Sequence, residues 1–215
     1  MSSTRQRAAK VVKLLGREYP EAHTALSYRT PWELLVATIL SAQCTDRRVN
    51  EVTPDLFARW PEAEDLADAA RADIEEAIRS TGFFRNKAKS LQEAARMLVA
   101  DYGGRVPDDI EELVRLPGVG RKTAKVVLGE AFEIAAGVAV DTHVGRVTRR
   151  LGLSREKDAE KVAADLEALV PRSEWIALSM RMILHGRRLC TARHPHCSDC
   201  FLEPLCPKMG VTSSQ

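Results

Sequence analysis

The sequence predicts an all-α protein, and this prediction depends on the spacing of apolar residues and on the scarcity of alternating patterns. Apolar side chains recur every three or four residues in residues 32–40, 91–99 and 162–170, which is the period of a helix with one buried face. Alternating runs typical of strands are sparse, and aromatic residues, which strands favour, make up only 5% of the chain. We therefore expect about ten helices.

Pro and Gly residues mark the breaks between these helices. The chain has 215 residues, of which 45% are apolar, enough to bury one large core or two smaller ones. The breaks fall at residues 19–20, 30–31, 60–61, 81–82, 102–104 and 151–152. None is a long linker, so composition alone does not divide the chain into domains.

Charge is distributed unevenly along the chain although the formal net charge is only +2. Residues 62–76 are strongly acidic, whereas residues 143–155 and 181–193 carry several Arg and no acid. This asymmetry favours one basic face of the kind that a phosphate backbone requires. The N-terminus lacks a secretory signal and no apolar run is long enough to span a membrane, so we expect a soluble, cytosolic protein.

Two helices are predicted on either side of the sequence LPGVGRKTAK at residues 116–125. Asp108 followed by Glu111 resembles a capping box and predicts the start of the first helix. The second helix has apolar residues at helical spacing: Ala124, Val127, Leu128, Ala131 and Phe132. Pro-Gly-Val-Gly is therefore predicted to be a hairpin between two helices.

The glycines of this hairpin have two possible roles. Gly118 and Gly120 can adopt positive φ and allow another backbone to approach their amides, and these amides lie at a helix N-terminus that attracts anions such as DNA phosphate. The alternative is a turn that needs glycine for its geometry alone. The hairpin by itself leaves both interpretations open.

Lys122 falls in the first turn of the second predicted helix. The helix dipole disfavours a cation there and so favours the neutral amine, which is a nucleophile. A surface lysine is most often only a solvated charge. The unfavourable position of Lys122 weakens that simpler interpretation without removing it.

Asp141 is placed where another helix should begin, within the segment VAVDTHVGRV. It is a natural N-cap, because its carboxylate can accept amides of the first helical turn. The same hydrogen bonds would keep it ionised and fixed, which suits an electrostatic or base role beside a reacting cation. His143 is better explained as a packed or phosphate-facing residue than as a proton shuttle.

Four cysteines follow the spacing C-x6-C-x2-C-x5-C near the C-terminus, at Cys190, Cys197, Cys200 and Cys206. In a reducing compartment such clustering favours a metal site over disulfides. Thiolates serve both zinc and a [4Fe–4S] cluster, so the spacing alone does not choose between them. The fifth, Cys44, is expected to fill the core of an apolar helix.

Taken together, these motifs resemble the endonuclease III family, bifunctional DNA glycosylases of the helix-hairpin-helix superfamily. The resemblance includes residues 34–46, residues 116–128, the VDTHVGRV segment and the cysteine loop, and it extends from about Tyr19 to Lys208. It implies two helical domains with a DNA cleft between them. Residues 25–134 would form a six-helix bundle ending in the hairpin, and residues 1–24 with 135–215 would form a discontinuous iron–sulfur domain.

The resemblance also implies roles for individual residues. Lys122 would attack C1′ of a damaged nucleotide flipped out of the duplex, and Asp141 would stabilise the cationic sugar. The remaining positions would contact DNA: Gln43 in the gap left by the nucleotide, Phe83 and Phe84 beside the orphan base, His143, and Gly118, Val119 and Gly120 in the hairpin. The four cysteines would bind a [4Fe–4S] cluster, and a monovalent cation would bind the hairpin carbonyls.

The activity expected from this resemblance is base excision repair. A monomer would remove oxidised pyrimidines from duplex DNA and cleave the abasic site through a lysine Schiff base. Two alternatives are an adenine-type monofunctional glycosylase and a non-catalytic DNA-binding protein. The adenine-specific branch lacks the Schiff-base lysine and has a catalytic Glu where this chain has Thr38, so Lys122 and Thr38 both argue against it.

Overall fold

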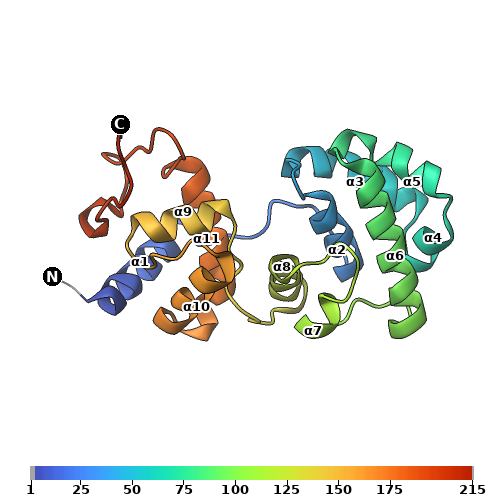
Figure 1. Ribbon diagram of the computed structural model, residues 1–215, viewed down its shortest axis with the longest axis horizontal. Helices are drawn as coiled ribbons and strands as arrows, with labels where there is room; N and C mark the ends of the chain where they lie inside the picture. Colours follow the sequence, from blue (N-terminus) through green and yellow to red (C-terminus); the bar gives the residue numbers. More distant parts are fainter. Residues whose placement is uncertain (1–2, 215) are drawn as a thin grey trace. The chain divides into compact units, whose positions relative to one another are not determined.

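The computed structural model describes residues 3–214, which form eleven α-helices, three short 3-10 helices and no strand (Figure 1). The all-α prediction is confirmed. The elements are α1 (Thr4–Glu18), α2 (Pro31–Leu40), α3 (Asp46–Arg59), α4 (Ala63–Asp68), α5 (Arg71–Ala77), η1 (Arg79–Thr81), α6 (Phe84–Tyr102), α7 (Ile110–Leu113), α8 (Arg121–Phe132), α9 (Thr142–Arg150), α10 (Ala159–Leu169), η2 (Arg172–Glu174), α11 (Trp175–Arg188) and η3 (Glu203–Leu205).

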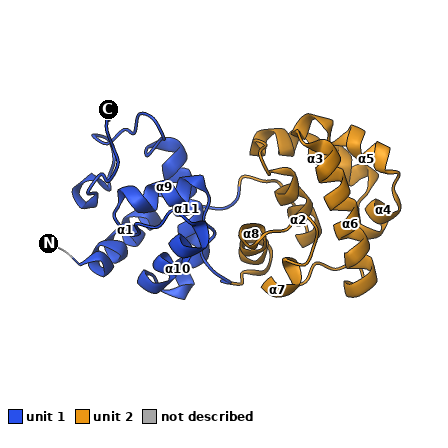
Figure 2. Cartoon of the chain, viewed as in Figure 1, with its two compact units in different colours: residues 1–24, 135–215 blue, residues 25–134 orange. Residues whose placement is uncertain are grey.

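The chain divides into two compact units, shown in different colours in Figure 2. We call residues 25–134 the bundle unit, and residues 1–24 with 135–215 the split unit. Of the split unit, residues 1, 2 and 215 lie outside the described part of the chain. The bundle unit contains α2 to α8, which is seven α-helices rather than the expected six, and one of them, α7, is a single turn. In residues 3–214 there is no helix with the length and apolarity needed to cross a membrane.

Helix α2 is the core of the bundle unit. Nine of its ten residues are buried, as expected for a helix that is apolar on nearly all sides. It packs against α3, α6 and α8, while α4 and α5 cover α6. The loops at the two ends of α2 are therefore held by a fully packed element.

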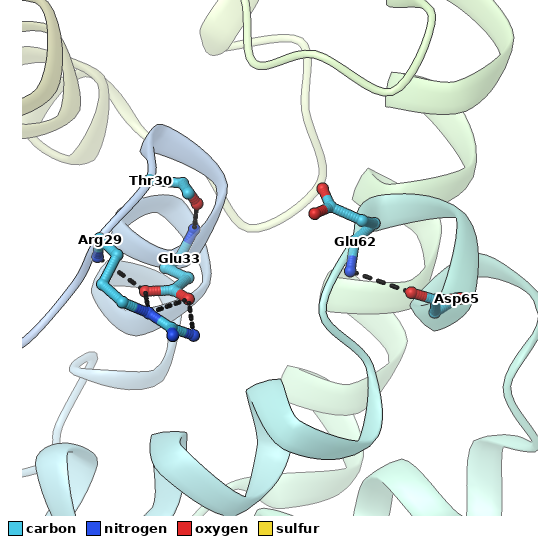
Figure 3. A network of polar contacts seen from close by, with 5 residues as sticks. All are labelled: Arg29, Thr30, Glu33, Glu62 and Asp65. Carbon is cyan, nitrogen blue, oxygen red and sulfur yellow. Dashed lines mark hydrogen bonds and ion pairs between the residues drawn. The ribbon is translucent and has the colours of Figure 1, made fainter.

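Hydrogen bonds fix the beginning of α2, as Figure 3 shows. The Thr30 side chain accepts the amide of Glu33, as an N-cap should. The buried Glu33 carboxylate in turn accepts the backbone N–H of Arg29 at 2.7 Å and its guanidinium at 2.7 Å. Pairing of this kind stabilises a carboxylate that is otherwise costly to bury. Helix α4 begins in a similar way, with the Glu62 amide donating to Asp65.

The split unit joins the N-terminal helix to the C-terminal helices. Helix α1 packs against α10 and α11, and α9 packs against α10 and α11. At the end of α1, the Tyr19 carbonyl accepts the guanidinium of Arg181 at 3.2 Å. The Tyr19 ring also packs edge-on against His185 and Phe201. Segments more than 160 residues apart are thereby held together.

Candidate functional site

The predicted hairpin connects α7 to α8 in the bundle unit. The Val119 N–H donates to the Leu116 carbonyl at 3.0 Å, which closes the turn. Gly118 has φ +82°, in the left-handed region that favours glycine. Gly120 is the N-cap of α8 and has no side chain to cap it. The first-turn amides of α8 are therefore not satisfied by a cap.

The predicted start of the first hairpin helix is wrong by one residue. Asp109, and not Asp108, is the N-cap of α7, and its Oδ1 accepts the amides of Glu111 at 2.8 Å and Glu112 at 3.1 Å. Because two aspartates are adjacent, the capping pattern fits either register in the sequence. The helix itself is a single turn, Ile110–Leu113.

Gly118 lies where two helices of the bundle unit approach the hairpin. A Cβ atom at this position would be 2.9 Å from the Cβ of Ser90 on α6 and 3.5 Å from Cγ2 of Ile39 on α2. At Gly120, whose φ is −93°, a Cβ would meet no atom within 4 Å. The geometric requirement for glycine therefore applies to Gly118 and not to Gly120.

Gly118→Ala should lower the free energy of unfolding by about 1–3 kcal/mol, because alanine is strained at this φ and clashes with Ser90. Gly120→Ala is the matched control and should change it by under about 1 kcal/mol. Urea unfolding of both variants measures the difference. Equal losses in the two variants would show that the turn does not depend on the conformation of Gly118.

The hairpin presents amides to solvent. Within residues 3–214, neither the Gly118 nor the Gly120 N–H has a hydrogen-bond acceptor. Val119 differs, because its N–H is used in the turn and its side chain is 5% exposed. A ligand can therefore be bound by the glycine amides, whereas Val119 can offer only its carbonyl oxygen.

Lys122 is the second residue of α8 and its side chain is exposed. It differs from the two neighbouring cations. Arg121 forms an ion pair with Glu111 at 2.9 Å, and Lys125 is buried. Lys122 has no hydrogen bond or ion pair to any residue that the structure describes. Its amine is therefore available to react with a ligand.

Asp141 is the N-cap of α9, as predicted, and its Oδ1 accepts the Val144 amide at 2.8 Å. This bond fixes the carboxylate at the start of the helix. The half-exposed side chain lines a surface pocket together with the cations Arg149 and Lys157. Asp141 belongs to the split unit and Lys122 to the bundle unit.

His143 lies in the first turn of α9 and is partly buried. Its Nδ1 is 3.0 Å from Nη2 of Arg146, and this nitrogen also donates to the Gly186 carbonyl. A guanidinium can only donate, so Nδ1 accepts and the ring proton lies on Nε2. His143 is thus a packed residue whose Nε2–H remains as a donor, in agreement with the interpretation as a packed or phosphate-facing residue.

Gln43 and Phe83 lie in two loops of the bundle unit and have the same unusual backbone conformation. Their φ angles are +52° and +48°, values that residues other than glycine rarely adopt. Gln43 is exposed, and Phe83, at 63%, is the most exposed large apolar residue within residues 3–214. Phe84 is only partly exposed, and its ring lies beneath the guanidinium groups of Arg79 and Arg85 at 5.8 and 5.5 Å. Of the two phenylalanines, Phe83 is therefore the one whose ring is available to contact a ligand.

Thr38 and Cys44 both have local environments that the structure defines. Thr38 is buried on α2 and its hydroxyl donates to the Leu34 carbonyl at 2.7 Å, so its side chain is occupied within its own helix. Cys44 was expected in the core of a helix. It lies instead in the turn after α2, where it is partly exposed, because the helix ends at Leu40.

The four C-terminal cysteines line one cavity in the split unit. It encloses about 400 Å³ that no atom fills, some of it open to solvent, and its walls also include Arg150 and His185. Arg150, at the end of α9, donates to the Cys190 Sγ at 3.3 Å and to the carbonyls of Thr191 at 2.6 Å and Ala192 at 2.9 Å. One buried guanidinium thus organises the start of the cysteine loop.

The four cysteines are only partly exposed to solvent. Burial raises the pKa of Cys200 to about 11 and also raises that of Cys206. Burial lowers the pKa of His185, whose Nε2 lies 3.6 Å from the Cys200 Sγ, to about 4. The raised pKa values favour the neutral thiols of Cys200 and Cys206, so binding a metal through these two residues releases protons. Across residues 3–214, no three His, Cys, Asp or Glu side chains are grouped closely enough to hold a single metal ion.

The sequence analysis did not identify Lys87 on α6, a buried charged residue near the loops that contain Gln43 and Phe83. It is 6% exposed, and its Nζ donates to two backbone carbonyls. The signal was present in the sequence, because Lys87 occupies a position four residues before Leu91 on the apolar stripe of the helix. A lysine in that register is buried unless the helix is rotated.

Comparison with known proteins gives one family for most of the chain. The profile described as "HhH-GPD superfamily base excision DNA repair protein" matches residues 36–172. Endonuclease III of Synechocystis sp. is 54% identical over 207 residues, which is 96% of this chain and 94% of that protein. Endonuclease III of Bacillus subtilis is 46% identical over 193 residues, or 89% of this chain and 88% of that protein.

Solved structures give the same result. A trapped endonuclease III–DNA covalent intermediate, described as an estranged-adenine complex, matches with a TM-score of 0.91 at 42% identity and covers 97% of both chains. A thermostable thymine-DNA glycosylase matches with a TM-score of 0.87 at 26% identity, covering 96% of this chain and 98% of that one. The similarity therefore includes both the hairpin and the cysteine loop.

Proposed function

This chain belongs to the HhH-GPD superfamily and, within it, to the endonuclease III family, and from that premise we propose how its residues carry out the reaction. The chain is a bifunctional DNA glycosylase and abasic-site lyase of base excision repair. Its substrates are oxidised pyrimidines in duplex DNA. The observation that carries the lyase activity is the exposed, unpaired Lys122 at the start of α8.

The reaction begins at the Lys122 amine. Its Nζ attacks C1′ of the damaged nucleotide, the bond from C1′ to the base breaks, and the base leaves with the electron pair. The amine proton is lost to a base, a role for which Asp141 supplies a fixed carboxylate. The sugar ring then opens to a Schiff base between C1′ and Nζ.

Strand cleavage follows from the Schiff base. Removal of a C2′ proton sends its electron pair towards the iminium, and the bond from C3′ to its oxygen breaks, releasing the 3′ phosphate group. Water then hydrolyses the Schiff base and regenerates the lysine. The Asp141 carboxylate stabilises the cationic sugar and iminium, an electrostatic contribution that only the charged intermediates receive.

Backbone and loop groups position the DNA. The Gly118 and Gly120 amides bind a phosphate at the N-terminus of α8, where the dipole favours an anion. The Val119 carbonyl is one of the hairpin oxygens available to a monovalent cation. Gln43 fills the gap left by the flipped nucleotide, and Phe83 stacks beside the orphan base. His143 offers Nε2–H to a phosphate.

The cysteine loop fits a [4Fe–4S] cluster better than a zinc ion. Zinc draws four sulfurs to within about 3.8 Å of one another, given bonds of about 2.3 Å in a tetrahedron. Here Cys190, Cys197, Cys200 and Cys206 surround a cavity without converging on one point. A cluster bound by them would hold the loop rigid, and N–H groups of Arg150 and Lys208 already point at two of the sulfurs.

We expect the purified protein to be yellow-brown and to contain about four iron atoms per chain. Cys200→Ser should lower the iron content and the visible absorption, because one of the four cysteine ligands is removed. Cys44→Ser is the matched control and should retain both, since Cys44 lies outside the loop. Elemental analysis and the absorption spectrum measure this, and a colourless protein with one zinc would contradict the cluster.

Trapping with borohydride tests the proposed function as a whole. Borohydride reduces the Schiff base to a stable amine, so a lyase becomes covalently attached to damaged DNA. The wild-type protein should form this adduct with duplexes that contain oxidised pyrimidines, and a panel of lesions gives its preferences. If the protein binds every duplex but forms no adduct, this would favour a DNA-binding protein, and base release without an adduct would favour a monofunctional glycosylase.

We place the protein in the cytoplasm of a prokaryotic cell, as a monomer bound to the nucleoid.

A further inference from the structure

Lys87 is a buried lysine that no step of the proposed reaction uses. Its side chain lies on α6 with 6% exposure. Its Nζ donates to the carbonyl of Leu40 at 2.8 Å and to the carbonyl of Thr81 at 2.8 Å. Burial lowers the pKa of Lys87, and the nearby Cys44 sulfur partly opposes that effect. Lysine is almost never buried unless it is paired, so these two bonds define its role.

The two carbonyls end two structural elements. Leu40 is the last residue of α2, and Thr81 is the last residue of η1. Carbonyls at a helix C-terminus lack partners within the helix, and a cation there also interacts favourably with the helix dipole. Lys87 therefore ties the end of one helix to the end of another through a single nitrogen atom.

Each of these ends leads directly into a loop proposed to contact DNA. Gln43 lies three residues after Leu40, and Phe83 lies two residues after Thr81. Both have positive φ, and they are two of only four such non-glycine residues in residues 3–214. Residues in this conformation persist where the surrounding structure holds them. Lys87 hydrogen-bonds to the residue that ends the element before each of these two loops.

The same face of α6 also supports the hairpin. Ser90 lies three residues after Lys87 and therefore on the same side of the helix. Its Cβ is the atom nearest to the position of a Cβ on Gly118. Helix α6 thus contacts the end of α2, the end of η1 and the hairpin through residues on one side of the helix.

We propose that Lys87 is a positioning residue that fixes the separation of Gln43 and Phe83, so that both side chains can occupy the space opened by a flipped nucleotide. This inference rests on the proposed function, because it assumes that these two residues contact the DNA duplex. It assigns Lys87 no contact with the substrate. Its effect should therefore appear only when a complementary strand and an orphan base are present.

The test compares one abasic site in two contexts, a duplex and the same strand alone. Lys87→Met removes both hydrogen bonds while keeping a long side chain. We expect it to slow single-turnover cleavage of the duplex about tenfold and to leave cleavage of the single strand within about twofold. Lys89→Met is the matched control, the same change on an exposed lysine of the same helix, and should change neither rate.

The ratio of the two rates decides between outcomes. An unchanged ratio for Lys87→Met, whether both rates fall together or neither does, would overturn the inference. A wild-type protein that cleaves neither substrate would instead remove the proposed function. Lys87→Gln, which can reach only one carbonyl, gives the same test if Lys87→Met does not fold. In a Gln43→Ala, Phe83→Ala background, either Lys87 change should no longer alter the ratio, because the residues it positions are gone.

Discussion

Lys122→Ala should abolish covalent trapping and slow strand cleavage at an abasic site on the order of a thousandfold or more, because the nucleophile is removed. The fold should be unaffected, since the Lys122 side chain is exposed and has no hydrogen bond or ion pair to any residue that the structure describes. Alanine also favours a helix, so α8 should form as before. Borohydride trapping and single-turnover cleavage measure the loss, and duplex binding at low salt shows whether the variant still reaches DNA.

Arg121→Ala is the matched control for this experiment. Arg121 is the preceding residue, also cationic, and its ion pair with Glu111 is exposed, so its contribution to stability is small. The control should retain adduct formation even if it binds DNA more weakly. An adduct of normal yield from Lys122→Ala would exclude Lys122 as the nucleophile and reduce it to a phosphate contact.

Asp141→Asn should slow cleavage by about a hundredfold to a thousandfold while leaving the protein folded. Asparagine caps a helix about as well as aspartate, so the bond to the Val144 amide can be kept while the negative charge is lost. Single-turnover rates and the urea midpoint of the same preparation separate these two effects. A lower rate with an unchanged midpoint is the expected pair of results.

Asp158→Asn provides a control within the same unit. Asp158 caps α10 by accepting the amides of Glu160 at 3.1 Å and Lys161 at 3.0 Å, and no catalytic role is proposed for it. Its substitution should leave the cleavage rate unchanged. If Asp141→Asn behaves like Asp158→Asn in both measurements, Asp141 is a helix cap and nothing more.

Local signals in the sequence were sufficient where a structure depends on neighbouring residues. The Asp141 cap and the helix over residues 124–132 depend on contacts within a few positions, and the structure has both. The Asp109 cap shows the limit of such signals, because two adjacent aspartates satisfy the same pattern and the sequence does not choose between them.

Long-range contacts explain what the sequence could not predict. The apolar stripe of α6 indicates that Lys87 is buried, but its two partners, the carbonyls of residues 40 and 81, come together only when the bundle unit is packed. The cysteine spacing identified candidate ligands but does not choose between zinc and a [4Fe–4S] cluster, because that choice depends on how the fold arranges the four sulfurs. No composition signal marks the split unit, because a chain that leaves a domain and returns needs no linker.

The hydrogen bonds of Tyr19 to Arg181 and His185 affect the order in which the two units can fold. Helix α1 emerges from the ribosome first, whereas its packing partners α10 and α11 emerge only after the whole bundle unit has been synthesised. Contacts this distant in sequence form slowly, since a long loop must close before they contribute. During synthesis the bundle unit can therefore fold before the helices that pack against α1 have been synthesised. We therefore expect the split unit to be completed last, so a chain interrupted before α11 would contain Lys122, the proposed nucleophile, without a complete split unit.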